Sequence, residues 1–356
     1  GVESSHHTTI RRDAFMIGRK TVRIALFSSL VVALVIAGVG STGAAAPWPS
    51  RPITLIIPFA PGGATDLIAR ALKPHMEKAL GVPMAATNMP GAATAVGHQY
   101  VWDAPHDGYT VLTQPTDITS IAVMEQSKFT PKDWHVFGVS VAVPAVFVVH
   151  PDSPYKTVQD MVADMNKRQI TVAVAARGCA WTRAVMLFAN TLGTKAPQLV
   201  PMGGGNPAAV SAMKREVDVG ACGLPEAIEL ILGKRLRVLA YFGGEEVELA
   251  GVGKVPSIGQ VYPALKQFLP FGGWVGISVP KDTPAAVVEK IQKAYDYAVS
   301  TPEFAKFVKE SYFANVGLTG KAAADYVDKS TSVNAWLLYD LGIAPKSPAE
   351  FGIARP

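Results

Sequence analysis

The sequence predicts an α/β protein with two domains, each a mainly parallel sheet flanked by helices. Strand-like apolar runs alternate with helical patterns over most of the chain, which is typical of parallel sheets. The alternation comes in two sets, separated at His150 and Pro151. Residues 273–356 contain too few strands for a third sheet, so we expect this segment to rejoin the first domain.

The chain begins with the pattern of a secretory signal peptide, which we place at residues 1–45. A basic cluster at residues 19–23 precedes the uncharged stretch 24–40, and small residues follow it. We expect cleavage after Ala45, and residues 1–15 could lie upstream of the true start. The alternative is a membrane anchor, for which the stretch is slightly shorter than the roughly 20 residues of a span.

The charge balance excludes one class of partner. The whole chain has 33 basic and 28 acidic residues. Residues 1–45 hold five basic and two acidic side chains, so the remaining chain carries 28 basic against 26 acidic ones. No basic run remains in it, which argues against nucleic-acid binding. An apolar content of 49% is ample for the cores of two domains.

The first expected unit is a strand, a glycine turn and a helix. Residues 53–57 are β-branched and nearly all apolar, as in a strand buried on both faces. Gly62 and Gly63 break the run, and apolar residues then recur at helical spacing as far as Leu80. The free N–H groups and positive dipole end of such a helix suit an anion. The alternative is a tight turn in which Asp66 stabilises the helix start.

The later elements repeat this order. The first set continues with a short strand ending at Asn88, a helix to about Trp102, a strand through Leu112 with a break at residues 114–117, and extended runs over Val136–Val141 and Ala145–Val149. The second set has a helix around Thr157–Met165, the strand–helix units "ITVAVAARGCAWTRAVMLFA", "LVPMGGGNPAAVSAM" and "EVDVGACGLPEAIELIL", and the strand "RLRVLAYF". The remainder has a strand over Trp274–Val279 and helices over Pro302–Ser311 and Gly320–Leu338.

We therefore expect the first domain to comprise residues 46–148 and 273–356, and the second domain residues 149–272. We expect Ala145–Val149 and Trp274–Val279 to pair with each other as the two strands that cross between the domains. Two domains joined by two crossings would form a hinged cleft.

Six motifs in order resemble one family. They are "WPSRPITLIIPFAPGGATDLIARAL", "NMPGAATAVG", "DGYTVL", "VPMGGGNPAAVSAMKREVDVG", "GKRLRVLAYF" and "PKDTPAAVVEKI". The sequence resembles the periplasmic substrate-binding proteins of tripartite tricarboxylate transporters, the Bug receptors, over nearly the whole chain after the leader. The resemblance implies a type II-like periplasmic-binding-protein fold with two crossing strands as a hinge. It also implies a monomeric, non-catalytic receptor without a cofactor, which delivers a small carboxylate to membrane transporter subunits.

The sequence departs from the family pattern where a ligand would be chosen. Ala93 and Thr94 stand where glycines are usual, and His106 is an insertion. The stretch "GVGKVPSIGQ" is a reduced form of a common motif, and "RGCAWTR" replaces a loop that is usually small and polar. These departures leave the identity of the carboxylate open.

The resemblance implies that main-chain N–H groups of Ala60–Thr65 and of Gln114–Asp117 hold a carboxylate of the ligand. Charge-assisted hydrogen bonds of this kind are strong, and the helix start adds a favourable field. Asp66 is interpreted as structural, because a second carboxylate there would repel the first. The expected ligand-binding residues are Phe59, Ala60, Gly62, Gly63, Ala64, Thr65, Gln114, Thr116, Asp117, Arg177, Gly178, Cys179, Trp181, Thr182, Gly204 and Gly205.

Two side chains in the unusual loop could define the rest of the ligand. Arg177 offers a planar fork for a second carboxylate, and Trp181 offers a face for an apolar or aromatic body. The ligand would then be a dicarboxylate or an aromatic acid. The alternatives are a surface ion pair for Arg177 and helix packing for Trp181. Cys179 and Cys222 could form a disulfide after export, or remain as two free, partly buried thiols.

Other chemistries find little support. Gly203, Gly205 and Ala208 have the spacing of a dinucleotide loop, but no acidic residue follows at the required distance, so we expect a glycine loop lining the cleft. We find no nucleophile elbow and no His-Glu-x-x-His motif. The histidines after the leader lack metal-ligand spacing. Two other functions remain open: a receptor for a membrane sensor kinase, and a secreted transferase on the same scaffold.

Overall fold

The computed structural model describes residues 47–356, and the expected signal peptide lies outside them. The chain divides into a segment that ends at Ser50 and a compact unit from Arg51 to Pro356. All helices and strands among the described residues belong to the compact unit. None of the helices in residues 47–356 combines the length and the apolar character that a membrane-spanning segment needs.

The first part of the compact unit alternates strands and helices. Its elements are β1 (Ile53–Ile57), α2 (Ala64–Leu80), β2 (Met84–Asn88), η1 (Ala92–Thr94), α3 (Ala95–Asp103), β3 (Thr110–Pro115), η2 (Thr116–Thr119), η3 (Pro131–Asp133) and β4 (Trp134–Val149). The next elements are α4 (Val158–Lys167), β5 (Thr171–Val174), α5 (Ala180–Thr191), β6 (Gln198–Pro201), α6 (Gly205–Met213), β7 (Val219–Gly223), α7 (Leu224–Leu232) and β8 (Arg237–Tyr241).

The last part of the unit is mainly helical. Its elements are β9 (Val247–Leu249), β10 (Gly253–Val255), α8 (Ile258–Val261), η4 (Pro263–Phe268), β11 (Gly272–Pro280), α9 (Ala285–Ser300), α10 (Pro302–Glu310), β12 (Ala314–Thr319), α11 (Gly320–Asp340) and η5 (Pro348–Phe351). The strand β12 was not expected from the sequence, because its exposed residues and Gly317, with φ +55°, lack the alternation of a buried strand.

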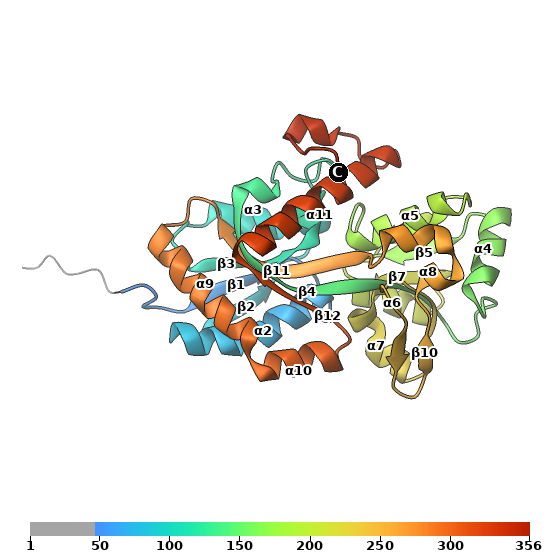
Figure 1. The fold of residues 1–356 in the computed structure, drawn as a ribbon, viewed down its shortest axis with the longest axis horizontal. Coiled ribbons are helices and arrows are strands. Elements are labelled where there is room, and N and C mark those ends of the chain that lie inside the picture. Colours follow the sequence, from blue (N-terminus) through green and yellow to red (C-terminus); the bar gives the residue numbers. More distant parts are fainter. Residues whose placement is uncertain (1–46) are drawn as a thin grey trace, which may run out of the picture. The chain divides into compact units, whose positions relative to one another are not determined.

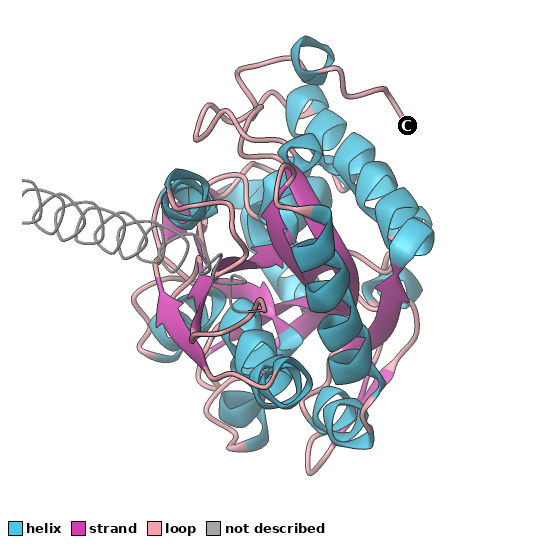
Figure 2. Cartoon of the chain, turned by 90° about the vertical axis from the view of Figure 1, so that its left-hand side faces the viewer, coloured by secondary structure: helices cyan, strands magenta, loops and turns pink. Residues whose placement is uncertain are grey.

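Ten of the described strands form two half-sheets that share β4 (Figure 1), and β9 and β10 pair with each other as a separate antiparallel sheet. The first half-sheet has the order β2-β1-β3-β11-β4, with β12 also paired with β4. The second half-sheet has the order β4-β7-β5-β6, with β8 also paired with β4. In both, the strands that belong to strand–helix units pair in parallel, whereas β4, β8, β11 and β12 pair antiparallel. Figure 2 shows helices on both sides of the strands.

The strand β4 is continuous over 16 residues, whereas two separate runs were expected. Its first part pairs with β11, and the pairing ends where Gly272 lies opposite Pro144. From Ala145 onward β4 pairs with β7 and β8 instead. Pro144 lies where β4 changes partners, which is a position where the missing N–H of a proline is tolerated.

The expected pairing of Ala145–Val149 with Trp274–Val279 is wrong. Trp274–Val279 lies opposite His135–Ala142, and Ala145–Val149 pairs with β7 and β8. The reason is that β11 begins only at Gly272, so its antiparallel register reaches no further along β4 than Pro144. The chain therefore returns from the second half-sheet to the first through the loop before β11. In this loop the Phe271 carbonyl accepts a hydrogen bond from the Ala145 N–H, at an N···O distance of 3.1 Å.

Each half-sheet has its own apolar core. Around the first half-sheet, Ile56, Leu112 and Trp134 are fully or almost fully buried in one cluster. Around the second, Val146 and Cys222 belong to another cluster, together with apolar residues of α6 and α7. Because the apolar faces of the helices pack against these strands, the carboxyl ends of β1, β3, β5 and β7 are held at fixed places, where loops can form a site.

Candidate functional site

The turn between β1 and α2 is fixed by the side chain of Asp66. The main-chain N–H of Gly62 donates to Oδ2 of Asp66, N···O 3.0 Å, and Gly62 has φ +79°, which favours glycine. Oδ1 of Asp66 accepts from Nε of Arg70 and from Nδ2 of Asn88, both at 2.9 Å. Burial acts to raise the pKa of Asp66, but these hydrogen bonds outweigh it and lower the pKa. Asp66 therefore has the structural role expected of it.

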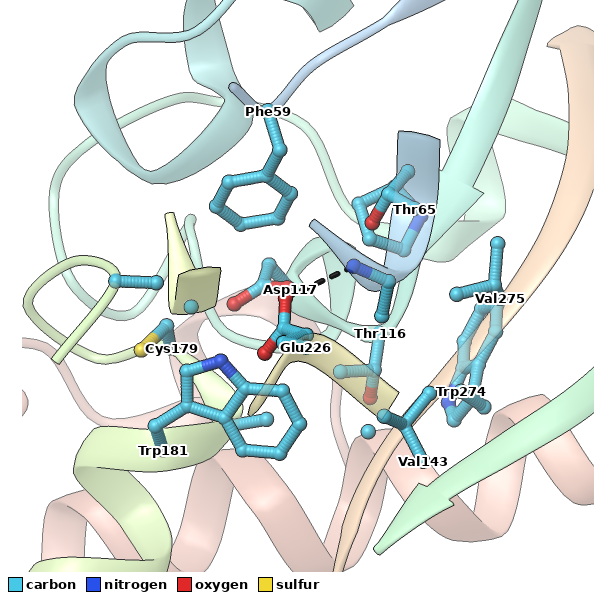
Figure 3. A pocket seen from close by; sticks show the side chains of 16 residues that line it. Phe59, Thr65, Thr116, Asp117, Val143, Cys179, Trp181, Glu226, Trp274 and Val275 are labelled. Atoms are coloured by element: carbon cyan, nitrogen blue, oxygen red, sulfur yellow. Dashed lines mark hydrogen bonds between the residues drawn. The ribbon is translucent and has the colours of Figure 1, made fainter. Parts of the chain in front are cut away.

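A small pocket lies beyond this turn, between the two half-sheets (Figure 3). Its lining comes from the loops after β1, β3, β5 and β7 and from β4, β11 and the start of α6. The lining residues are Phe59, Ala64, Thr65, Pro115, Thr116, Asp117, Val143, Ala175, Cys179, Ala180, Trp181, Gly205, Glu226, Gly273, Trp274 and Val275. The cavity has a volume of about 30 Å³, which is small beside the roughly 300–1,000 Å³ of typical ligand pockets.

Glu226, at the start of α7, reaches across this pocket. Its Oε1 accepts a hydrogen bond from the N–H of Ala64, the first residue of α2, at an N···O distance of 2.8 Å. Its Oε2 accepts from the N–H of Gly223, which precedes α7, at 2.7 Å. Figure 3 shows the carboxyl group of Glu226 next to Asp117, in the middle of the lining side chains. One carboxyl group thus joins the first half-sheet to the second.

Three helix starts converge on the carboxyl group of Glu226. Besides α2 and α7, α6 begins at Gly205, where a Cβ atom would lie 1.8 Å from Oε2 of Glu226. Only glycine leaves room for the carboxyl group at that distance. The N–H groups and dipoles of helix starts favour negative charge. The pocket therefore has the local chemistry of an anion site, built from main chain.

Burial raises the pKa of Glu226 to about 7, although the hydrogen bonds from Ala64 and Gly223 oppose the shift. The nearby charge of Asp117 adds to the increase. Glu226 is only 6% exposed. Its carboxyl group therefore titrates near neutral pH.

Asp117 is the second carboxyl group in the lining. Burial raises its pKa to about 6, and the positive charge of Arg183 on α5 opposes that shift. Arg183 is fully buried, and its Nη1 donates to Oγ of Ser120 at 3.0 Å and to the Gly178 carbonyl at 2.9 Å. Within the described part of the chain, Oδ1 of Asp117 and both Nε and Nη2 of Arg183 have no hydrogen-bond partner. The buried charge of Arg183 thus offsets that of Asp117.

The lining is aromatic and acidic. Phe59, Trp181 and Trp274 contribute rings, and Asp117 and Glu226 contribute carboxyl groups. None of the sixteen lining residues is a lysine, an arginine or a histidine. Among residues 47–356, no group of three or more His, Cys, Asp or Glu side chains could hold a metal ion. Anion binding in this pocket would rest on main-chain and hydroxyl donors.

The structure brings together about half of the residues expected from the sequence. The expected residues that line the pocket are Phe59, Ala64, Thr65, Thr116, Asp117, Cys179, Trp181 and Gly205. The expected residues outside this lining are Ala60, Gly62, Gly63, Gln114, Arg177, Gly178, Thr182 and Gly204. Most of the second group are direct neighbours of lining residues, and their main chain shapes the same loops.

Gln114 points away from the pocket into a buried polar network. Its Nε2 lies 3.0 Å from Nε2 of His98, and its Oε1 accepts from Oγ of Ser278 at 2.8 Å. Since Gln114 donates there, His98 accepts through Nε2, and its Nδ1–H donates to the Thr94 carbonyl at 2.9 Å. Burial lowers the pKa of His98 to about 4, which keeps the ring neutral. The network ties β3, β11 and α3 together.

Arg177 is exposed, and it lines a neighbouring cavity instead of the pocket itself. That cavity, of about 280 Å³, shares Phe59 and Ala175 with the pocket. The main-chain carbonyl of Arg177 accepts from Nε2 of Gln126 at 2.9 Å. Arg177 thus lies at the rim of the site, in the lining of the neighbouring cavity.

Cys179 and Cys222 are free thiols in the structure, so the disulfide alternative does not occur in it. Both are buried, and burial raises the pKa of each thiol. Cys179 caps the start of α5 and lines the pocket, whereas Cys222 lies in β7 within the apolar core.

Glu226 was not identified from the sequence as a residue of the site. Its signal was present, since a Glu three residues after Gly223, with a proline between them, is the pattern of a helix start. That pattern indicates a cap and does not show that the carboxyl group also reaches α2. The other lining residues that were not expected are Pro115, Val143, Ala175, Ala180, Gly273, Trp274 and Val275.

One family profile, the tripartite tricarboxylate transporter family receptor, matches residues 68–336. The chain belongs to this family. A UPF0065 protein from Agrobacterium vitis, encoded in the ttuE–ttuC′ intergenic region, is 29% identical over 80% of this chain and 82% of its own length. The protein BugT of Bordetella pertussis is 25% identical over 81% of this chain and 87% of its own length.

Solved structures share the fold. One described as a periplasmic transporter is 26% identical, with a TM-score of 0.75, over 83% of this chain and 99% of its own. The periplasmic binding protein BugD is 24% identical, with a TM-score of 0.76 and the same coverage. Two R. palustris proteins, solved with adipate and with malate, have TM-scores of 0.75 and 0.73 at 21% and 22% identity. The architecture is thus the α/β fold of periplasmic binding proteins, and the family consists of non-catalytic solute-binding receptors.

Proposed function

We propose that this protein is a periplasmic receptor that captures a small carboxylate in a cleft between two domains. It would deliver the carboxylate to the membrane subunits of a tripartite tricarboxylate-type transporter. The observation that carries the proposal is the main-chain anion position at the start of α2, where the N–H of Ala64 already holds a carboxyl group. Membership of the receptor family supports the role of the cleft.

The two half-sheets would be the cores of the two domains. Residues 46–148 and 273–356 would form one domain, and residues 149–272 the other. The chain passes between the half-sheets in β4 and in the loop before β11. A pocket of about 30 Å³ is too small for a dicarboxylate, so the domains would have to separate before a ligand enters and close again over it.

The ligand would be a dicarboxylate or an aromatic acid. Relatives of similar fold hold adipate and malate, which supports a carboxylate. The rings of Phe59, Trp181 and Trp274 favour an apolar or aromatic body next to that group. Arg177 at the rim would contact a second carboxylate if the ligand extends toward the neighbouring cavity.

Location and partners follow from the same proposal. The expected signal peptide would export the chain to the periplasm, where a monomer would bind its ligand and then dock on the transporter. Family membership supports the transporter as the partner. No cofactor is required by this role, because the receptor only binds and releases its ligand.

A ligand screen tests the proposal. The protein is mixed with mono- and dicarboxylates, and its melting temperature is recorded, since a ligand that binds only the folded state raises stability by RT ln(1 + [L]/Kd). A carboxylate that raises the melting temperature is then measured by calorimetry with Thr65→Glu. This change adds a like charge beside the anion position, so we expect binding to be abolished.

The matched control is Gln159→Glu, which adds the same charge at an exposed position on α4. It should leave the affinity unchanged, and circular dichroism should show that both variants are folded. Unchanged affinity in a folded Thr65→Glu variant would contradict the proposed position of the carboxylate. A screen without any binding carboxylate would contradict the proposed function.

A further inference from the structure

The carboxyl group of Glu226 occupies the position that the proposed function gives to the ligand. The N–H of Ala64 is the first donor of α2, and it is already used by Oε1 of Glu226 at 2.8 Å. In the same pocket, the hydroxyl of Thr116 and Oδ1 of Asp117 are buried without a hydrogen-bond partner within the described residues. The pocket therefore has unused polar atoms, but its principal anion donor is occupied.

Glu226 cannot turn away from the pocket while it keeps its place in α7. Its Oε2 is held by the N–H of Gly223, in the same half-sheet, at 2.7 Å. Gly205 lies against the carboxyl group from α6, and Nδ2 of Asn206 donates to the Glu226 carbonyl at 3.0 Å. If the domains separate, Glu226 stays with the second half-sheet and leaves Ala64. When they close again over a ligand, Glu226 returns to the same place.

We infer that Glu226 determines which ligands this site accepts, because a ligand carboxylate can share the anion position with Glu226 only when a proton lies between them. This inference rests on the proposed function. Two ionised carboxylates in contact in a buried site repel each other strongly, and such pairs hold one proton in common. The proton comes from solvent. It forms an O–H bond on one carboxyl group, and that group donates a hydrogen bond to the other.

The groups around Glu226 supply no alternative to that proton. Asp117, from η2, adds negative charge, and Cys222, from β7, is a buried thiol whose pKa burial raises. Cys179, at the start of α5, is likewise buried with a raised pKa. Asp66, on α2, is engaged with Arg70, Asn88 and the turn at Gly62.

The nearby cation is Arg183 on α5, and its charge acts on Asp117. Its Nη1 donates to Ser120 and Gly178, and the groups that shift the pKa of Glu226 are Ala64, Gly223 and Asp117 together with burial. A ligand carboxylate at the anion position would therefore meet Glu226 without a compensating positive charge. Burial already raises the pKa of Glu226 to about 7 in the unliganded protein, which is consistent with proton uptake in the neutral range.

The inference predicts selection by charge. Well above the pKa of Glu226, where its carboxyl group is ionised in the free protein, each carboxylate that binds at Ala64 takes up one proton, so its affinity falls about tenfold for each further pH unit. A ligand that instead places an ammonium group beside Glu226 would need no proton, and its affinity would not fall in this way. The site would thus prefer carboxylates at mildly acidic pH.

Calorimetry on the full chain tests this with benzoate and succinate as probes. Binding is measured from about pH 6 to about pH 8, in phosphate and in Tris, whose ionisation enthalpies differ. At about pH 6 Glu226 already holds its proton, so we expect little uptake on binding there, and an uptake that rises toward one proton per ligand at about pH 8. The affinity should fall about fivefold between about pH 7 and about pH 8, and about tenfold per pH unit above that. The same dependence is expected for Glu229→Gln, which removes an exposed carboxylate from the same helix.

Glu226→Gln should bind with an affinity that does not fall between about pH 7 and about pH 8, because its amide does not titrate and Asp117, with a pKa of about 6, is already ionised there. If circular dichroism shows that this variant does not fold, the proton uptake measured for the unaltered protein tests the inference by itself. A carboxylate that binds without proton uptake and with a flat pH profile would overturn the inference and leave the proposed function standing. If no carboxylate shifts the melting temperature at any of these pH values, the proposed function fails, and the inference falls with it.

Discussion

Oδ2 of Asp66 accepts a hydrogen bond from the N–H of Gly62, four residues earlier, at 3.0 Å. The side chain thereby satisfies a donor in the turn that leads into α2, and it also binds Arg70 and Asn88. The glycine turn is consequently held by a side chain that does not line the pocket. The shape of the anion position depends on this residue, although Asp66 does not line it.

Replacing Asp66 with alanine should destabilise the fold. The change removes the acceptor of the half-buried Gly62 N–H and one of the two acceptors of Nδ2 of Asn88, which keeps the Phe59 carbonyl. Hydrogen bonds to a charged group typically contribute about 1.5–3 kcal/mol. Urea unfolding measures the loss. Asp325→Ala is the control, because it removes an exposed carboxylate paired with Lys321 and should change stability by no more than about 0.5 kcal/mol. Equal effects of the two changes would contradict the structural role of Asp66.

The unliganded protein should lose stability as the pH rises toward neutrality. The folded pKa values of Asp117 and Glu226 are about 6 and about 7, above the ordinary values of 3.8 and 4.5. The folded state therefore binds more protons than the unfolded state in this window. The contribution is fully present below the ordinary values and is lost as the pH rises through about 6 and about 7.

Urea unfolding at about pH 5 and about pH 8 measures this loss, and Glu226→Gln should reduce it. The carboxylates whose pKa values are lowered, such as Asp66 and Asp218, act below about pH 4. Buried His98 acts in the opposite direction, because its pKa is lowered to about 4 and it adds stability as the pH rises toward its ordinary value of 6.5. The comparison with Glu226→Gln, in which His98 is unchanged, therefore isolates Glu226, and equal changes of stability in the two proteins would show that Glu226 is not protonated in the folded state.

Both cysteines should be found as slow-reacting thiols. Cys179 and Cys222 are 2% and 0% exposed, and burial raises the pKa of each. Since the thiolate is the reactive form, alkylation of the native protein should be slow and should become fast in denaturant. Mass spectrometry after alkylation should count two thiols in protein purified without reductant. A count of zero in denaturant would instead establish a disulfide.

Arg177→Ala should distinguish diacids from monoacids. The guanidinium is exposed at the rim, so its contact with a second carboxylate would be worth about 1 kcal/mol or less, and would weaken with added salt. We expect a few-fold loss of affinity for a diacid such as adipate and none for hexanoate, its monoacid counterpart. Calorimetry at low and high salt checks this. Equal losses for both acids would show that Arg177 does not contact the second carboxylate.

The sequence was sufficient for the architecture, because the fold depends on patterns that are local in the chain. The glycine turn, the strand before it and the helix after it all occur as expected, and Gly320–Asp340 extends the expected last helix by only two residues. The part of β4 that pairs with β11 was expected wrongly as Ala145–Val149, because register depends on where a distant strand begins. No local pattern indicated that the start is Gly272.

The site was less predictable for the same reason. Thr65, Trp181 and Gly205 could be placed because the ends of parallel strands share one edge of a sheet. Gln114 also lies at the carboxyl end of a strand, β3, but its side chain turns toward His98 and Ser278, which are distant in the chain. Glu226 shows the opposite error, because a residue of the site was not expected. The local sequence indicates only a helix cap, whereas the side chain also accepts a hydrogen bond from Ala64 in α2, 162 positions earlier.

The shared strand β4 has a consequence for how the molecule comes apart. Residues 134–144 carry the pairing with β11, and residues 145–149 carry the pairing with β7 and β8. Unfolding either half-sheet would leave its own part of β4 without pairing partners, directly joined through an unbroken strand to the part that the other half holds. The two cores are thereby mechanically coupled, and heat should melt them together in one cooperative transition, with equal calorimetric and van't Hoff enthalpies.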